Sequence, residues 1–203
     1  MLFYDSPNPA PNPRRVRIFA AEKGIDLPSK EVSIPKREQK APDFVAKNPR
    51  GQTPILELDD GTVIAESVAI MRYLEAEYPD PPLFGRSSRE IAAIEMWNRR
   101  TEMILMPPVA AVWVHTHPFT AALPGRNAEW GEANRSHVDE ALRFFDTSLE
   151  ERQFLAGEAF SAADILLLTT VDFAKFIGLE VSGKCANLAG WHERVSARAS
   201  AQA

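Results

Sequence analysis

The sequence predicts two domains, a small α/β layer domain followed by an all-helical domain. Three observations predict this division: strand and helix patterns alternate over residues 1–80, apolar residues recur at helical spacing from residue 90 onward, and a proline-rich break separates the two regions. The break runs from Tyr78 to Ser88, where three prolines and a glycine end one helix and serines open the next. We therefore expect domains at residues 1–80 and 87–203.

Composition excludes several classes of function. The 203 residues carry a formal net charge of −5, so the chain lacks the basic surface with which proteins bind nucleic-acid phosphates. Its single cysteine, Cys185, allows neither a disulfide framework nor a Cys-based metal site, and fits a reducing compartment. No apolar run approaches the ~20 residues that span a bilayer, and we expect no signal peptide. These features predict a cytoplasmic protein with no nucleic-acid or membrane partner.

The first domain has the predicted order βαβαββα. A hairpin is indicated by two apolar strands around Asp59-Asp60-Gly61, because Asp-Gly favours a tight turn. The other boundaries follow from apolar spacing and from helix-ending glycine or helix-capping serine. The predicted strands are 2–4, 32–34, 55–58 and 62–65, and the predicted helices are 13–23, 40–47 and 67–77.

The second domain is predicted to consist of helices. A long helix over 90–115 must be kinked or interrupted at Pro107-Pro108, and another covers 137–152. Ser161 and Asp164 form a capping-box pattern ahead of the apolar run Ile165–Leu168. We expect the helix behind this box to be buried on all sides.

The first candidate site is the loop Ser6 to Pro13, which has proline at every second position. Alternating prolines fix φ and stiffen the loop, so its polar side chains are held in place. Two interpretations of Asn12 stay open: it is the N-cap of a helix whose first residue is Pro13, or it points with the helix N-terminus at an anionic ligand atom. Ser6 and Asn8 lie further back and are weaker candidates.

Two further motifs could bind a peptide-like ligand. Pro54 directly before a strand suits an edge strand, the start of a strand or a cis turn. In a cis turn, the Thr53 backbone N–H and C=O would point outward, ready to pair with an extended peptide. Ser67 opens a helix beside Glu66. A capping role alone would explain Ser67, but the pair would also suit a group that bears both an α-carboxylate and an α-ammonium.

The motif His115-Thr116-His117 suggests a metal site, but residues at i and i+2 do not share a helix face. No cysteine or acidic group nearby in the sequence completes a ligand set. We therefore expect no metal and no cofactor.

Taken in order, these motifs resemble those of cytosolic glutathione transferases over essentially the whole chain. The resemblance is carried by Pro13–Arg17 and Ala20–Ile25 of the first helix, Asn48–Leu56, Leu58–Thr62, Glu66-Ser67, and the Ser161/Asp164 capping box. It implies a thioredoxin-like N-terminal domain, a helical-bundle C-terminal domain and a homodimer. It also implies a detoxifying transferase with glutathione as co-substrate.

The resemblance assigns binding roles by position. Thr53, before the cis-type Pro54, would hold the cysteinyl backbone of glutathione. Glu66 and Ser67 would hold its γ-glutamyl end. Gln39 and Gln52, with Lys40 as a further candidate, would meet the glycine carboxylate, since amides and ammonium groups bind carboxylates.

The chain departs from the family pattern at the catalytic position. Where many members carry a serine, this chain has Ala10, which has no hydroxyl group. The resemblance to an atypical bacterial and fungal branch points instead to Asn12, and to His115 acting through water. Lowering a thiol pKa by about two units needs roughly 2.7 kcal/mol, and one hydrogen bond from an amide to the charged sulfur supplies about 1.5–3 kcal/mol.

The sequence therefore predicts an enzyme that stabilises the glutathione thiolate and adds it to a hydrophobic electrophile. Two alternatives remain open because Ala10 lacks the hydroxyl group. One is a glutathione-dependent disulfide reductase or peroxidase, and the other is a non-catalytic binding protein with the same fold.

Overall fold

The computed structural model describes residues 1–181, 183 and 185–203. The chain divides into two compact units, Met1–Leu83 with Ala199–Ala203, and Phe84–Arg198. The last five residues thus belong with the first unit, whereas the sequence led us to place them in a domain 87–203. The cause is a short helical turn, η4 (Ala199–Gln202), that lies against the first helix and gives its Ala201 carbonyl to Arg14 at 2.9 Å.

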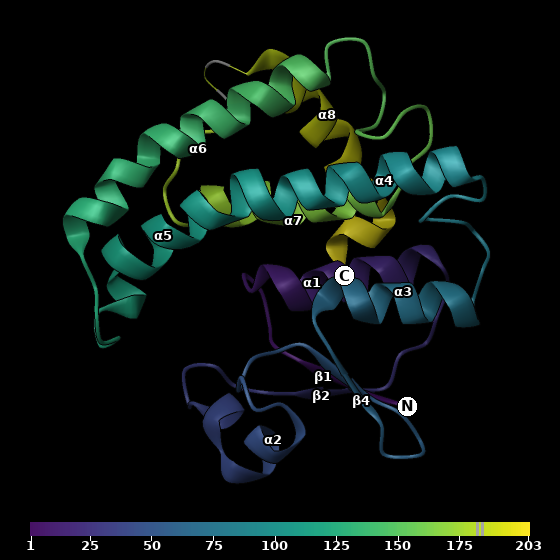
Figure 1. Cartoon of the computed structure of the whole chain (residues 1–203), viewed down its shortest axis with the longest axis vertical. Coiled ribbons are helices and arrows are strands. Elements are labelled where there is room, and N and C mark those ends of the chain that lie inside the picture. Colours follow the sequence, from purple (N-terminus) through teal and green to yellow (C-terminus); the bar gives the residue numbers. More distant parts are fainter. Residues whose placement is uncertain (182, 184) are drawn as a thin grey trace. The chain divides into compact units, whose positions relative to one another are not determined.

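The first unit is built on a four-stranded mixed sheet in the order β2-β1-β3-β4. Strand β2 is parallel to β1, and the other neighbours are antiparallel. Helices α1 and α3 cover one face, and α2 lies on the other (Figure 1). This is the predicted thioredoxin-like βαβαββα fold. The elements are β1 (Leu2–Asp5), α1 (Pro11–Glu22), β2 (Ser29–Glu31), η1 (Glu38–Lys40), α2 (Pro42–Lys47), β3 (Ile55–Glu57), β4 (Val63–Ala65) and α3 (Ser67–Glu77).

Alternation along β1 builds a core on each side of this sheet. Phe3 and Tyr4 are both buried, and successive strand residues point to opposite faces. Tyr4 meets Phe44 of α2 edge to face, with ring centroids 6.0 Å apart. Phe19 of α1 and Ile70 of α3 are fully buried. Apolar packing therefore holds α1 and α3 on this sheet, and the N-termini of both helices lie at the candidate site.

The second strand lies three residues earlier than predicted. Ser29, Lys30 and Glu31 pair with β1, while the apolar Val32 comes just after the strand and donates its N–H to the Asp5 carbonyl at 2.7 Å. The three paired residues are exposed, as edge-strand residues often are. The sequence pattern pointed to the apolar residues 32–34, and this prediction was wrong.

The second unit is helical, as predicted. The predicted long helix is interrupted by a π-helical turn (Thr101–Leu105), which ends two residues before Pro107. Helix α6 begins at Ala128, nine residues before the predicted start, because Asn127 caps it by accepting from the Trp130 N–H at 3.0 Å. The helices are α4 (Ser88–Arg100), α5 (Met106–Thr116), α6 (Ala128–Ser148), α7 (Ala162–Phe176) and α8 (Ala186–Ser196).

The capping box predicted at Ser161 and Asp164 is present and fixes the start of α7. The Asp164 carboxylate accepts from the N–H groups of Leu155 and Ser161 and from the Trp191 indole, at 2.8, 3.0 and 2.9 Å. Burial raises the pKa of this carboxyl, and the donors oppose that rise. Residues 162–171 are buried, as predicted for the whole helix, whereas Lys175 and Phe176 at the end of α7 are exposed.

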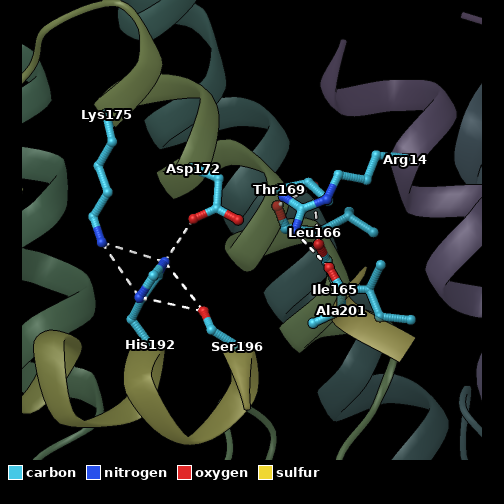
Figure 2. Close-up of polar contacts among 9 residues, drawn as sticks. All are labelled: Arg14, Ile165, Leu166, Thr169, Asp172, Lys175, His192, Ser196 and Ala201. Atoms are coloured by element: carbon cyan, nitrogen blue, oxygen red, sulfur yellow. Dashed lines mark hydrogen bonds and ion pairs between the residues drawn. The ribbon is translucent and has the colours of Figure 1, made fainter. Parts of the chain in front are cut away.

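Helix α8 is joined to α7 by a polar contact at the surface. His192 lies 2.6 Å from the Asp172 carboxylate, with Lys175 and Ser196 beside the ring (Figure 2). In the described part of the chain, no helix is both long enough and apolar enough to cross a bilayer.

Candidate functional site

The register of the sheet gathers the predicted binding residues of the first unit at one edge. Tyr4 pairs with Ile55, and Ile55 pairs with Ala65. The residues just after β1, just before β3 and just after β4 therefore lie side by side. These are Ser6, Thr53-Pro54 and Glu66-Ser67.

The side chain of Thr53 is held by a hydrogen bond, while its backbone groups have no backbone partner among the described residues. The Thr53–Pro54 peptide bond is cis, which is one of the three arrangements open to Pro54 from the sequence and the one that the family resemblance implies. The Thr53 hydroxyl lies 2.8 Å from that of Ser6, and the buried Ser6 hydroxyl donates to the Val32 carbonyl at 2.9 Å. Within the described residues, neither the N–H nor the C=O of Thr53 takes part in a backbone hydrogen bond. A strand-like ligand backbone can pair with both groups.

The turn at Gly51 brings the predicted glycine-carboxylate residues together. Gly51 has φ +55, and a Cβ at this position would lie 2.7 Å from the Gln39 carbonyl oxygen. Lys40 donates to the Arg50 carbonyl at 3.0 Å, and Arg50 donates to the Gln52 side-chain oxygen at 2.9 Å. The Gln39 side-chain oxygen is buried without a hydrogen-bond partner among the described residues. Amide and cationic groups thus surround this turn.

Glu66 and Ser67 occupy the start of α3, but not as the sequence indicated. The helix begins at Ser67, and Glu66 is the N-cap residue, with φ +70 and no side-chain cap. The interpretation of Ser67 as the N-cap is therefore wrong. Ser67 is buried, and its hydroxyl accepts from Arg15 at 3.4 Å, whereas Glu66 is exposed. A left-handed backbone at a non-glycine residue often marks a functional position.

The position at which α1 begins excludes the interpretation of Asn12 as an N-cap. Helix α1 begins at Pro11, Ala10 is its N-cap residue, and no side chain caps it. Asn12 is therefore the second helical residue and not a cap, because the helix starts two residues earlier than predicted. Asn8 is engaged by Arg17 at 2.6 Å. Asn12 thus lies in the first turn of α1, where backbone N–H groups lack intrahelical partners.

His115 lies in the second unit, near the end of α5. Its Nδ1 accepts from the Asn127 N–H at 3.1 Å, so the neutral ring carries its proton on Nε2. His117 Nδ1 accepts from the Phe119 N–H at 3.2 Å, and its ring lies against that of Trp113, with centroids 4.5 Å apart. The two histidines thus have separate partners. Among the described residues, no three His, Cys, Asp or Glu side chains are grouped as metal ligands.

Comparison with known proteins agrees with this architecture. The family model "Glutathione S-transferase, N-terminal domain" matches residues 10–77, and "Glutathione S-transferase, C-terminal domain" matches residues 104–199. Glutathione S-transferase 2 of Saccharomyces cerevisiae is 39% identical over 204 residues, which cover 98% of this chain and 87% of the yeast protein. The chain belongs to the glutathione S-transferase family.

Solved structures of this transferase family share the whole fold. The crystal structure of Gtt2 from Saccharomyces cerevisiae superposes with a TM-score of 0.93 at 38% identity, covering 100% of this chain and 99% of that one. A glutathione S-transferase of class Gtt2 from Vibrio parahaemolyticus gives a TM-score of 0.87 at 36% identity, covering 100% and 96%. The similarity therefore extends over both units.

In this member of the transferase family, Arg15 is a residue of the site region that sequence patterns did not single out. Its side chain is buried at the α1–α3 packing surface, where it meets Ser67. The available signal was its place directly before the buried Val16, three and four residues from the buried Ile18 and Phe19. A charged residue within an apolar helix stripe is rarely buried without a specific partner.

Proposed function

We propose that this chain is a glutathione transferase that binds reduced glutathione at the edge of the sheet in its first unit. The observation that carries the proposal is the open Thr53 backbone beside the N-terminus of α3. One part of this edge suits an extended peptide backbone, and the neighbouring part suits a carboxylate. Glutathione offers both groups within one small molecule.

Each end of glutathione has suitable partners along this edge. In the proposed complex, the cysteinyl N–H and C=O pair with the Thr53 backbone. The γ-glutamyl carboxylate receives the Ser67 hydroxyl and the free N–H groups of α3, and its ammonium group faces the Glu66 carboxylate. The glycine carboxylate meets Gln52 and Gln39, with Lys40 nearby, because amides and ammonium groups are its natural donors.

Thiolate stabilisation is assigned to Asn12. Position 10 is alanine, so no hydroxyl is available there. Asn12 combines an amide donor with the positive end of α1, and both favour an anionic sulfur. His115 is the second proposed catalytic group, through its Nε2. The bound thiolate then attacks the electrophilic carbon of an apolar substrate, and the thiol proton leaves to solvent.

Because Ala10 has no hydroxyl group, glutathione-dependent disulfide reduction is a second candidate activity. In disulfide reduction, the bound thiolate attacks one sulfur of a substrate disulfide, which releases a substrate thiol and leaves a mixed disulfide. A second glutathione then resolves the mixed disulfide to oxidised glutathione. Assays that separate a conjugate from oxidised glutathione as the product distinguish the two reactions.

We also propose that the protein is cytoplasmic and that its second unit contributes to a homodimer. A groove of about 600 Å³ between α5 and α6 is lined mainly by apolar side chains. Met103 and Trp130 on its rim are 71% and 55% exposed, and a second copy would cover them. Light scattering should give twice the chain mass, and Met103→Asp should shift the protein toward monomer.

The test of the proposed function is a titration of bound glutathione. Thiolate absorbance near ~240 nm, followed over about pH 5 to 9, should give saturable binding and a bound-thiol pKa below ~7. Asn12→Ala should raise that pKa by about one unit or more, while Asn8→Ala, in the loop before α1, should leave it unchanged. Absence of saturable glutathione binding would contradict the proposal. Binding without a thiolate signal would favour the non-catalytic alternative.

A further inference from the structure

Gly131 brings the first turn of α6 close to the end of α5. It is buried, and a Cβ at this position would lie 2.5 Å from the γ-methyl group of Thr116 and 2.9 Å from the Cβ of His115. Both distances are well below the separation of about 3.5–4.0 Å that non-bonded carbon atoms prefer. Any larger residue at position 131 would therefore push the start of α6 away from α5.

Backbone conformation does not explain this glycine. Gly131 lies inside α6, and its φ is not among the positive values that favour glycine. Alanine is the more favourable residue in the interior of a helix. Gly190 in α8 is also helical, but a Cβ there would meet the Arg194 guanidinium at 3.5 Å, an ordinary contact. Close packing against α5 is therefore the property that requires glycine at residue 131.

The close approach of α6 holds the His115 ring in one orientation. The N–H of Asn127, directly before α6, donates to His115 Nδ1 at 3.1 Å. Asn127 is in turn fixed by the first turn of α6, because its carbonyl accepts from the Gly131 N–H at 3.1 Å and its side chain accepts from the Trp130 N–H at 3.0 Å. A displacement of this turn would therefore lengthen the bond to His115.

A second contact concentrates such a displacement at Asn127. The neighbouring Arg126 donates to the carbonyl oxygens of Val114 and His117 at the end of α5, at 3.0 and 3.2 Å. A cation is favoured at a helix C-terminus, so this contact ties residue 126 to α5. If α6 is pushed outward, the chain must turn between residues 126 and 131, and the N–H that holds His115 lies in that segment.

We propose that Gly131 is a positioning residue for His115, because the space that it leaves lets Asn127 hold the imidazole with Nδ1 as acceptor and the proton on Nε2. This inference rests on the proposed function, in which Nε2 is the nitrogen that acts on the thiol. An imidazole that loses the bond at Nδ1 can carry its proton on either nitrogen, and only one of these tautomers offers an N–H at Nε2.

The test compares the full chain with Gly131→Ala and with the matched control Gly190→Ala, which adds the same methyl group to another helix. Kinetics are measured with glutathione and an activated aryl halide as the electrophile. Gly131→Ala should lower kcat about tenfold and leave the KM of glutathione within about twofold. Gly190→Ala should leave both constants within about twofold and raise the melting temperature by about 2–4 °C.

Two double variants separate positioning from a general structural effect. Thr116→Ser removes the methyl group closest to the added Cβ and retains the hydroxyl, which donates to the Val112 carbonyl at 2.8 Å. Combined with Gly131→Ala, it should recover part of kcat, and this pair carries the test if Gly131→Ala alone does not fold. In a His115→Asn background, Gly131→Ala should lower kcat by less than a further twofold or so, because the residue through which it acts is gone.

Nitrogen-15 NMR of the His115 ring gives a readout that needs no substrate. At about pH 8, where imidazole is neutral, the wild type should show one tautomer with Nδ1 unprotonated, and Gly131→Ala should show a mixture of both. An unchanged tautomer in Gly131→Ala would overturn the inference, as would a full loss of kcat added to that of His115→Asn. A wild type that shows this tautomer but has no activity with glutathione would instead overturn the proposed function.

Discussion

The Thr53 hydroxyl donates to the hydroxyl oxygen of Ser6, 2.8 Å away. The direction follows from the second contact of Ser6, whose single hydrogen goes to the Val32 carbonyl at 2.9 Å. This chain of hydrogen bonds joins the ends of β1 and β3 through groups that are largely buried. It fixes the Thr53 side chain inward, so that the Thr53 backbone, and not its hydroxyl, is available to a ligand.

Thr53→Val should therefore separate stability from binding. The substitution keeps the shape of the side chain but removes the donor to buried Ser6, at a cost of about 1–2 kcal/mol in the free energy of unfolding. Glutathione affinity should stay within about threefold, because the proposed contact uses backbone groups. Urea denaturation and calorimetry measure the two effects, with Thr53→Ser as the control that retains the hydroxyl. A large loss of affinity in a stable Thr53→Val protein would assign recognition to the side chain.

Gly51 offers a sharper test of the glycine-carboxylate end. An alanine there must adopt φ +55 and place its Cβ 2.7 Å from the Gln39 carbonyl oxygen, so the turn that carries Gln39 must move. Gly51→Ala should cost about 1–3 kcal/mol in unfolding free energy and weaken glutathione about tenfold or more.

The matched control is Gly61→Ala in the β3–β4 turn. Gly61 also has positive φ, at +84, but a Cβ there meets no atom within 4 Å. This variant should show the backbone cost and retain glutathione affinity. If the two variants weaken binding equally, the turn at Gly51 has no specific part in recognition.

Local patterns were sufficient to predict much of the fold. Helix α3 has the predicted bounds 67–77, because its apolar residues recur at helical spacing, although Ser67 begins the helix and does not cap it. The cis bond before Pro54 is one of several arrangements that a proline directly before a strand allows, and the resemblance of the surrounding motif favoured it. The capping box at Ser161 and Asp164 is another feature that is set by residues close together in the sequence.

The features that local patterns missed depend on distant partners. Strand β2 consists of exposed Ser29, Lys30 and Glu31, which carry no apolar alternation and pair only because β1 lies beside them. The contact between Arg15 and Ser67 joins residues 52 positions apart. Nothing close to either residue in the sequence indicates the other, so only the packing of α1 on α3 reveals this part of the site.

The acid stability of the first unit should depend on Glu57. Its carboxylate accepts from Lys47 and from the Tyr4 hydroxyl, the latter at 2.6 Å. These hydrogen bonds lower the pKa of Glu57 below its usual value, and the bond from Lys47 has a larger effect than the bond from Tyr4. A carboxyl whose pKa is lowered by folding stabilises the fold above its unfolded pKa, and this contribution is lost as pH falls.

Urea denaturation between about pH 6 and pH 3 measures this contribution. The wild type should lose more stability than Glu57→Gln across the acidic part of this range, because the variant has no carboxylate to protonate at residue 57. Glu77→Gln, on the exposed end of α3, is the control and should parallel the wild type. Parallel curves for the wild type and Glu57→Gln would show that the contacts with Lys47 and Tyr4 add no stability.

The catalytic assignment of His115 can be separated from its structural contact. Its Nδ1 accepts the Asn127 N–H at the start of α6, while Nε2 is the nitrogen proposed to act on the thiol. Asparagine places its side-chain oxygen close to where Nδ1 lies but has nothing at the position of Nε2. His115→Asn should therefore keep the melting temperature and lower kcat about tenfold or more, with little change in the dissociation constant of glutathione.

His115→Ala should lower both kcat and the melting temperature, since it leaves the Asn127 N–H without its acceptor. Unchanged kcat in a stable His115→Asn protein would reduce His115 to its contact with α6 and leave Asn12 as the one proposed catalytic residue.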